Sequence, residues 1–158
     1  MKKTITNICL AFIFSICLSS CGNSYIIDES RDIDETGWSK DDVQNFKFNI
    51  NDTATNYQIL INVRHSNTFK TQNLWLFTET SLNGKLIKRD TVECFLANNA
   101  GEWLGSGFGS LHEMPILYEP KVAFKELGNY EISIRHGMRD MKLEGISDIG
   151  LQVIKLEK

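Results

Sequence analysis

The stretch YQILINVR, residues 57–64, places an apolar side chain at every second position from Tyr57 to Val63. Successive side chains of a β-strand point to opposite faces of the sheet, so this alternation predicts a strand with one buried face. FKFNI, residues 46–50, repeats the alternation. LWLFT, residues 74–78, is nearly all apolar and predicts a strand that is covered on both faces.

Turn signals separate these runs at short spacing. Asn83-Gly84 lies between two β-rich runs and predicts a two-residue hairpin, because both residue types tolerate the positive φ of a type I′ turn. No stretch longer than about ten residues shows the 3.6-residue period of a helix. About eight strands in one unit, residues 36–158, are typical of an all-β, antiparallel β-sandwich. The pattern fits a jelly-roll and an immunoglobulin-like topology equally well.

The amino-terminal segment has the features of a secretory leader that ends at a lipid-attachment cysteine. A basic head, MKK, precedes an apolar run over residues 5–18, which is shorter than the roughly 20 apolar residues of a spanning helix. The tetrapeptide LSSC, residues 18–21, resembles the bacterial lipobox. We therefore expect a signal peptide over residues 1–20, acylation of Cys21, and attachment to a lipid bilayer through the acylated Cys21.

The mature chain is expected to be a single acidic domain on a short stalk. We expect residues 21–35 to form the lipidated stalk, with residues 25–27 docking as a first strand. Without the leader, 138 of the 158 residues remain, with 15 basic and 20 acidic side chains and a net charge of −5. This balance disfavours nucleic-acid binding. Cys94 is the only other cysteine left, so we expect no intrachain disulfide, and its apolar neighbours predict a buried side chain.

The sequence contains no evident metal-binding constellation. His65, His112 and His136 lie far apart, and none has a neighbour at metal-ligand spacing. His136 falls on the apolar phase of its strand, which predicts a packed side chain. Residues 32–37 begin like a calcium loop, but Val43 stands where the loop needs a bidentate glutamate. We therefore expect no metal and no cofactor.

The sequence also lacks a recognisable nucleophile. Ser106 is not set in the Gly-x-Ser-x-Gly elbow of an α/β-hydrolase. Carboxylates are numerous, so a hydrolase with a carboxylate pair stays open as the third and weakest hypothesis, because the separation of such a pair is decided in space. Our expectation is that the chain is not an enzyme.

The glycine-rich segment NNAGEWLGSGFGSL, residues 98–111, predicts a close backbone approach or a bulged strand rather than a phosphate loop. Loops on a rigid scaffold commonly carry function, so this segment and the one around Trp38 are the candidate surface for protein contacts. An alternative function is glycan binding, with Trp38 or Trp103 stacking on a sugar ring. Trp75 lies in the apolar run and is expected in the core. The candidate interaction residues are Trp38, Trp103, Gly105, Gly107 and Phe108.

Several blocks along nearly the whole mature chain form a recognisable set. They are the lipobox, GWSKDD (37–42), FKF (46–48), NLWLF (73–77), GEWLGSGFG (101–109), GNY (128–130), HGMR (136–139), LEGI (143–146) and DIGL (148–151). Together they resemble the gliding-motility lipoprotein family of Bacteroidetes, GldH. The resemblance implies a non-enzymatic accessory lipoprotein, associated with cell movement over surfaces and with the motor and secretion apparatus that drives it. Its implied partners are envelope or gliding-machinery proteins. Family members also occur in species that do not glide, which favours a broader shared role in envelope assembly or secretion.

Two sequence features of proteins from that bacterial group add further expectations. Its surface-exposed lipoproteins often carry an acidic run just after the lipidated cysteine, whereas residues 22–25 here contain no acid, which favours a periplasm-facing location. The tripeptide Asp52-Thr53-Ala54 resembles the group's acceptor for O-glycosylation, so Thr53 is a candidate modification site. Thr91 has the same setting but falls within an expected strand.

Overall fold

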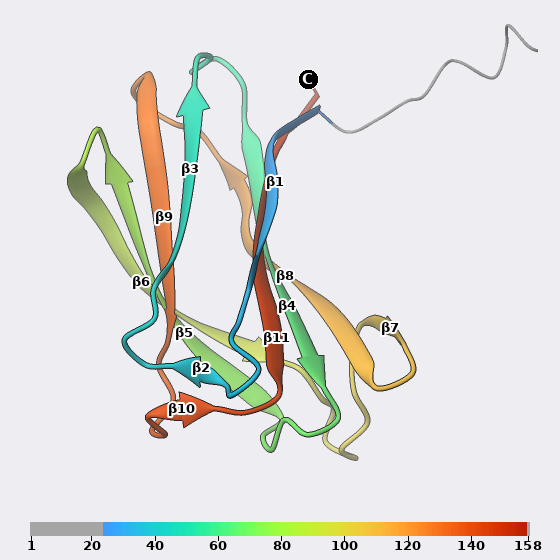
Figure 1. The fold of residues 1–158 in the computed structure, drawn as a ribbon. Coiled ribbons are helices and arrows are strands. Elements are labelled where there is room, and N and C mark those ends of the chain that lie inside the picture. The colour runs from blue at the N-terminus through green and yellow to red at the C-terminus, as the bar shows by residue number, and fades with distance from the viewer. Residues whose placement is uncertain (1–23, 158) are drawn as a thin grey trace, which may run out of the picture.

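The computed structural model describes residues 24–157, and this part of the chain forms strands without helices (Figure 1). The strands are β1 (Ser24–Asp32), β2 (Trp38–Ser39), β3 (Gln44–Ile50), β4 (Tyr57–Ser66), β5 (Asn73–Leu82), β6 (Lys85–Phe95), β7 (Ser106–Phe108), β8 (Leu111–Val122), β9 (Gly128–His136), β10 (Lys142–Leu143) and β11 (Ile146–Lys155).

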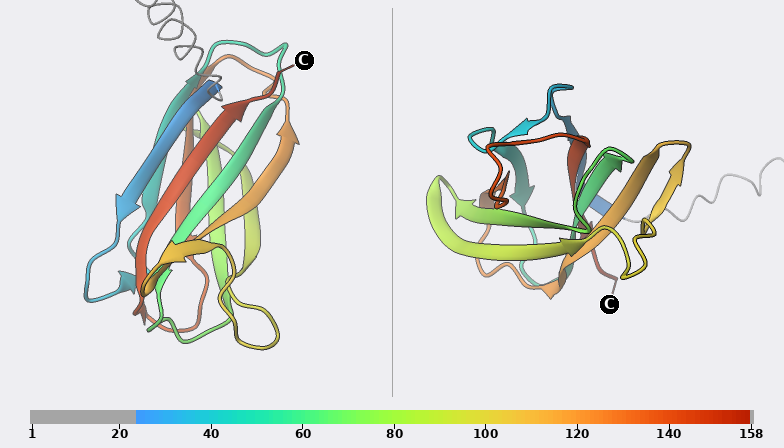
Figure 2. Two further views of the ribbon diagram at one scale, coloured as in Figure 1. Left: turned by 90° about the vertical axis from the view of Figure 1, so that its right-hand side faces the viewer. Right: turned by 90° about the horizontal axis from the view of Figure 1, so that it is seen from below.

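Two antiparallel sheets face each other (Figure 2). The five-stranded sheet has the order β1-β11-β4-β8-β7, and the four-stranded sheet has the order β3-β9-β5-β6. Among the eight long strands, only β5 and β6 are consecutive in sequence and adjacent in a sheet. This order is that of a jelly roll, which pairs two Greek keys face to face. The expected all-β antiparallel sandwich is confirmed, and the topology that the sequence left open is the jelly roll.

The core lies between the sheets and follows the predicted alternation. Side chains of β3 and β4 alternate between buried and more exposed positions along both strands. Phe46, Tyr57 and Ile61 are fully buried, as are Ile149 and Leu151 of β11. Each buried side chain of this size stabilises the fold by roughly 1.5–3 kcal/mol relative to an exposed one. The inner faces therefore supply most of the driving force for bringing the two sheets together.

The described part of the expected stalk is a strand of the sandwich. β1 pairs with β11 along its length, from Ser24 opposite Lys155 to Asp32 opposite Asp148. The side chain of Ile27 is buried in the core, and the Ser30 hydroxyl donates to Asp148 at 2.7 Å. The described part of the sandwich therefore begins at Ser24, before the expected boundary at residue 36. Cys21 and the signal peptide of residues 1–20 lie outside the described residues.

The apolar run of residues 74–78 is covered on one face only, contrary to expectation. Leu74 and Leu76 are fully buried, whereas Trp75 and Phe77 are 37% and 36% exposed. An antiparallel sandwich needs one dry face per sheet and leaves the other in contact with water. Trp75 therefore lies on the outer face of the four-stranded sheet rather than in the core.

Two turns follow the sequence prediction closely. Asn83 and Gly84 join β5 to β6 with φ values of +48° and +80°, which is the left-handed backbone of a type I′ turn. In the glycine-rich segment, a Cβ atom on Gly107 would lie 2.0 Å from the Leu111 carbonyl oxygen. Only a residue without a side chain lets the backbone pass there, which confirms the expected close approach.

The edge between β6 and β8 is closed by a polar network rather than by apolar packing. Lys88 points inward from β6 and pairs with Asp90 at 2.8 Å and with Glu119 of β8, while the Tyr118 hydroxyl donates to Asp90. Burial opposes the charge on Lys88, but the two carboxylates raise its pKa overall. Inward-pointing charges on an edge strand discourage pairing with another chain.

The sandwich has two ends of different character (Figure 1). Ser24, Lys155, Tyr57 and Val122 lie in one cross-strand row at what we call the proximal end, where β1 begins and β11 finishes. We call the opposite end the distal end. Segments 33–43, 67–72, 96–110 and 137–145 lie there. The glycine-rich segment is thus at the end far from the start of β1.

Shortening a buried side chain in β1 tests whether this strand folds as part of the sandwich. Ile27→Ala should lower the free energy of unfolding by about 2–4 kcal/mol, because it leaves a cavity in the core. Glu29→Ala, in the same strand but exposed, should change it by less than about 0.5 kcal/mol. Denaturant titration of both variants checks this. Equal stability of the two variants would contradict a β1 that folds with the sandwich.

Candidate functional site

The glycine-rich segment builds a short hairpin, β7–β8, at the distal end. Ser106 pairs with Glu113, Gly107 with His112, and Phe108 with Leu111. Gly105 adopts a φ of +84°, and a Cβ atom there would lie 2.2 Å from the Glu113 carbonyl oxygen. The expected site residues Gly105 and Gly107 therefore allow β7 to lie against β8.

Contacts at its turn hold the hairpin to the rest of the fold. The Asn67 amide donates to the Ser110 carbonyl at 3.0 Å. The His112 Nε2 atom is 2.8 Å from the Asn67 side-chain oxygen. These bonds tie the hairpin turn to the segment between β4 and β5. The hairpin turn is therefore held against the segment between β4 and β5.

The tip presents an aromatic side chain to solvent. Phe108 is 96% exposed, and its cross-strand neighbour Leu111 is 42% exposed. A hollow of about 330 Å³ beside them is also lined by Arg64 and Glu113, which form an ion pair at 3.0 Å. A pre-positioned aromatic side chain within a polar rim resembles the anchors on which protein interfaces depend.

Trp38 is not part of any surface, contrary to expectation. Its side chain is fully buried, and its indole N–H donates to the Asp42 carbonyl at 2.8 Å. The pairing of β2 with β10 fixes the segment, and the indole ring packs edge-on against His136 with centroids 5.3 Å apart. The segment around Trp38 folds over the end of the core, so Trp38 cannot stack on a sugar or contact a partner.

The half-buried Trp103 lies over two histidines that are far apart in the sequence. His65 and His112 are directly opposite each other on β4 and β8, with ring centroids 5.5 Å apart. The Trp103 ring lies 4.5 Å from His65 and 6.0 Å from His112. His65 occupies the inward phase of the alternation that begins at Tyr57, so that signal was present in the sequence.

The two fully buried histidines, His65 and His136, are held in their neutral form. Burial lowers the pKa of His65, with a further contribution from His112, and its Nε2 atom has no hydrogen-bond partner. Burial also lowers the pKa of His136. The Trp38 backbone opposes that shift, but no well-formed hydrogen bond reaches either ring nitrogen of His136. These histidines pack in the core, as predicted for His136.

Residues 24–157 bring together no group of three or more His, Cys, Asp or Glu side chains that could hold a metal ion. In the segment resembling a calcium loop, the Asp34 carboxylate instead accepts the Thr36 amide at 2.8 Å and closes a turn. Cys94 is buried, and burial raises the pKa of its thiol to about 12, which leaves it protonated and unreactive at neutral pH.

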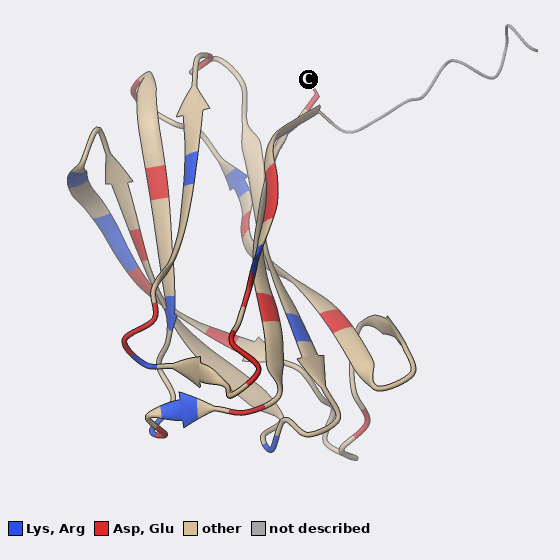
Figure 3. Ribbon diagram, viewed as in Figure 1, with Lys and Arg blue, Asp and Glu red and all other residues tan. Residues whose placement is uncertain are grey.

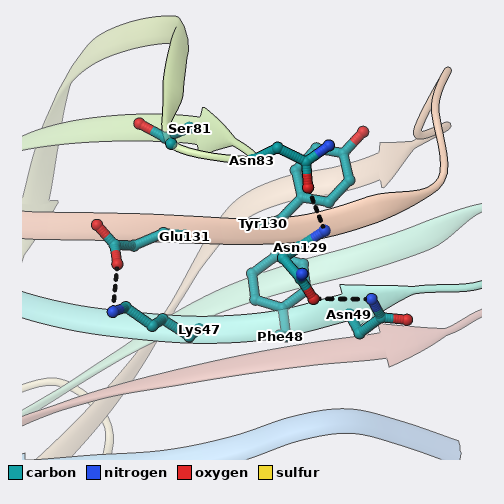
Figure 4. A pocket seen from close by; sticks show the side chains of 9 residues that line it. Lys47, Phe48, Asn49, Ser81, Asn83, Asn129, Tyr130 and Glu131 are labelled. Carbon is teal, nitrogen blue, oxygen red and sulfur yellow. Dashed lines mark hydrogen bonds and ion pairs between the residues drawn. The ribbon is translucent and has the colours of Figure 1, made fainter.

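A second candidate region, a hollow of about 650 Å³, lies near the proximal end. Figure 4 shows the side chains that line it. Its walls carry three side-chain amides, those of Asn49, Asn83 and Asn129. The Asn49 amide donates to the Asn129 side-chain oxygen at 2.9 Å. One carboxylate, Glu131, lines this hollow and is paired with Lys47 at 3.2 Å, so the hollow does not hold a carboxylate pair. No single motif marks it in the sequence, because its residues come from β3, β5, β9 and the β5–β6 turn.

Comparison with known proteins places the chain in a family. A family model described as GldH lipoprotein matches residues 25–153. The chain belongs to the GldH lipoprotein family. The resemblance that the sequence blocks indicated is therefore confirmed.

Two curated relatives match the GldH chain over nearly its full length. It is 39% identical to a protein of Christiangramia forsetii named gliding motility lipoprotein GldH homolog, over 91% of this chain and 93% of that protein. It is 30% identical to gliding motility lipoprotein GldH of Flavobacterium johnsoniae, over 94% and 96% of the two chains. The family is thus one of lipoproteins whose curated members are named for gliding motility.

Solved structures give only distant likenesses. The insecticidal delta-endotoxin Cry8Ea1 of Bacillus thuringiensis is 14% identical with a TM-score of 0.38, and the match covers 82% of this chain and 20% of that one. Latent PorU of Porphyromonas gingivalis is 11% identical with a TM-score of 0.33, covering 86% and 14%. These scores carry no argument about the function of this GldH protein. Among the residues that the structure describes, no helix has the length and apolarity to span a bilayer.

Acid sensitivity tests the neutral histidines. Their pKa values lie below the unfolded value of about 6.5, so below that pH the unfolded chain binds more protons and stability falls as pH falls. From pH 7.5 to 5.5 we expect the wild type to lose about 1–3 kcal/mol of unfolding free energy. His136→Leu should lose about half as much.

Denaturant titration at both pH values gives the measurement. Ile134→Val, a buried change without a titrating group, is the control and should leave the pH-dependent loss at the wild-type value. An identical loss in wild type and His136→Leu would show that His136 does not contribute.

Proposed function

We propose that this GldH protein is a lipid-anchored, non-enzymatic accessory component of the gliding-motility and secretion apparatus, and that it acts through protein–protein contacts made by the β7–β8 hairpin. The observation that carries the proposal is the almost fully exposed Phe108, which lies beside a hydrogen-bonded turn at the end opposite the start of β1. The family supports the motility role, and the hairpin supports the contact role.

The arrangement separates the anchor from the contact. An acylated Cys21 would precede Ser24 by three residues in the sequence, and Ser24 is at the proximal end. The 12-residue strand β8 runs from the distal hairpin to that end and spans about 40 Å. A chain held to a bilayer at its proximal end would therefore present Phe108 away from that bilayer. This favours an envelope protein, rather than the anchoring membrane, as what Phe108 meets.

The hairpin also has the energetic character of a binding element. An exposed phenylalanine gains roughly 1.5–3 kcal/mol when a partner buries it. Because Asn67 and His112 already fix the turn, little ordering entropy is lost on binding. Gly105 and Gly107 let β7 lie against β8, and in this proposal their role is to position Phe108 at the end of the hairpin.

The proposal also includes a location, acylation of Cys21 and glycosylation of Thr53. A periplasm-facing location is part of the proposal and is supported by the leader-like sequence and by residues 22–25, which contain no acid. Thr53 is proposed as the O-glycosylated residue because it is exposed in a fixed turn. The Asp52 carboxylate beside it accepts the Ala54 amide at 2.8 Å and pairs with Lys155 at 2.8 Å. Thr91, on the edge strand β6, is the weaker acceptor.

Mass spectrometry of the protein from its native membranes checks both modifications. We expect a mature amino terminus at Cys21 that carries acyl chains, and a glycan on the peptide containing Thr53. Cys21→Ala should lose acylation, and Thr53→Val should lose the glycan while keeping acylation. An unmodified Thr53 peptide would remove the glycan proposal, and a leader cut elsewhere than before Cys21 would remove the anchor.

In-cell photo-cross-linking tests the hairpin contact. A photoreactive residue at position 108 should capture envelope proteins of the motility or secretion apparatus. Phe108→Ala should reduce co-purification of the same proteins at least tenfold. Phe95→Ala, which changes another phenylalanine with an exposed ring, is the matched control and should have no effect. Recovery of the same proteins with both variants would contradict the contact role of Phe108.

A further inference from the structure

The outer face of the four-stranded sheet carries an ordered array of polar side chains. Cross-strand rows join Asn49 to Asn129, and Lys47 through Glu131 to Ser81. The following rows join Asn45, Ser133, Glu79 and Arg89, then Arg135, Phe77 and Thr91. From Asn129 to Arg135 the face extends about 20 Å along the strands.

This face is hollowed along its length. The hollow of about 650 Å³ near the proximal end is followed by one of about 170 Å³, lined by Ser133 and Arg135, and one of about 460 Å³, lined by Arg89 and Thr91. The two smaller hollows share Phe77, Glu79 and Arg135. Solvation of an outer face requires polar side chains but not a succession of hollows, so this face has the shape to hold an elongated ligand.

Four of the five charged side chains named on this face form ion pairs with one another. Lys47 pairs with Glu131 at 3.2 Å, and Arg89 pairs with Glu79 at 2.9 Å. The Arg135 guanidinium lies over the Phe77 ring, 5.6 Å from its centroid. Figure 3 shows basic and acidic positions on the neighbouring strands β3 and β9. A face with internally paired charges suits a neutral ligand better than a strongly anionic or cationic one.

The side-chain amides of the first hollow are only partly satisfied. Asn129 accepts from Asn49 through its side-chain oxygen, and the Asn83 oxygen accepts the Asn129 backbone amide at 3.1 Å. Within the described part of the chain this leaves the NH₂ groups of Asn83 and Asn129, the Asn49 oxygen and the Ser81 hydroxyl without protein partners. Figure 4 shows these side chains around one hollow. Closely spaced donors and acceptors of this kind match vicinal hydroxyl groups.

Two aromatic side chains continue the same face towards the distal end. Phe77 is held between Gly137, on which a Cβ atom would lie 3.0 Å from the ring, and the Arg135 guanidinium. Trp75 lies two residues before it on β5, and its indole N–H has no partner among residues 24–157. An exposed indole with a free N–H offers an apolar surface for stacking and one donor at its edge.

We propose that this outer face binds a neutral oligosaccharide, with Trp75 and Phe77 as the stacking platform and the amides of Asn49, Asn83 and Asn129 as partners for sugar hydroxyls. The two internal ion pairs, the row of hollows and the combination of amides with exposed aromatic rings favour a sugar chain. A protein partner would be expected to meet a more apolar centre than this face provides. This site does not rest on the hairpin contact, which belongs to the other sheet.

Indole NMR signals give a direct readout. The ¹⁵N-labelled full chain, kept in a sugar-free detergent, is titrated with cello-, malto-, xylo- and chito-oligosaccharides. At least one of these should shift the Trp75 indole signal in a saturable way, while the buried Trp38 signal stays unchanged as an internal control. Trp75→Ala and Asn129→Ala should weaken that binding at least tenfold. Phe108→Ala should leave it unchanged.

A blocking variant keeps the test independent of folding defects. Ser81→Trp would fill the first hollow from the surface and should weaken binding as strongly as Asn129→Ala. Thermal unfolding of each variant shows whether its fold is intact. The proposal is overturned if no probe gives a saturable Trp75 shift at about 10 mM, well above a millimolar Kd. Binding that survives Trp75→Ala and Ser81→Trp would also overturn it.

Discussion

Burial of one phase of side chains between two twisted sheets is the constraint on which the rest of this structure depends. β4 and β11 lie inside the five-stranded sheet and contribute fully buried residues such as Ile61 and Leu151. Those side chains pack against the four-stranded sheet, so each strand direction and register is fixed by which phase faces inward. A shift of one residue in the register of a strand would expose all of its buried side chains. The positions of both end loops and of both outer faces follow from this single condition.

The sequence contains this constraint in clear form only where polar and apolar residues alternate. Residues 46–50 and 57–64 alternate strictly, and the structure follows them. The run LWLFT does not show which phase is buried, because exposed Trp75 and Phe77 are as apolar as buried Leu74 and Leu76. The sequence of β1 is mostly polar, so it predicts a stalk with strand docking only at residues 25–27, whereas the whole of β1 pairs in the sheet. Its place in the sheet comes from pairing with β11, and the Ser30–Asp148 hydrogen bond joins residues 118 positions apart in the sequence.

The candidate sites were only partly predictable for related reasons. Gly105 and Gly107 mark the hairpin because a close backbone approach admits no side chain, and that signal is local. Trp38 lies in a polar, glycine-flanked segment that looks like an exposed loop, yet the loop closes over the core and buries the indole. The amide hollow gathers Asn49, Asn83 and Asn129 from separate segments. Only the register between β3, β9 and β5 brings such residues together.

The two surfaces can act at the same time because the jelly roll places them on different sheets. The β7–β8 hairpin extends the five-stranded sheet at the distal end, whereas the hollows follow the outer face of the four-stranded sheet. Among residues 24–157, no hydrogen bond or ion pair joins Asn67 and Ser110 at the hairpin turn to the Trp75 and Asn129 side chains. The core between the two surfaces does not need to move for either to bind. A bilayer anchor at the start of β1 would hold both surfaces at fixed distances from the membrane. Simultaneous engagement would then add the binding energies through a shared scaffold, so two weak contacts could fix the position of the protein in the envelope.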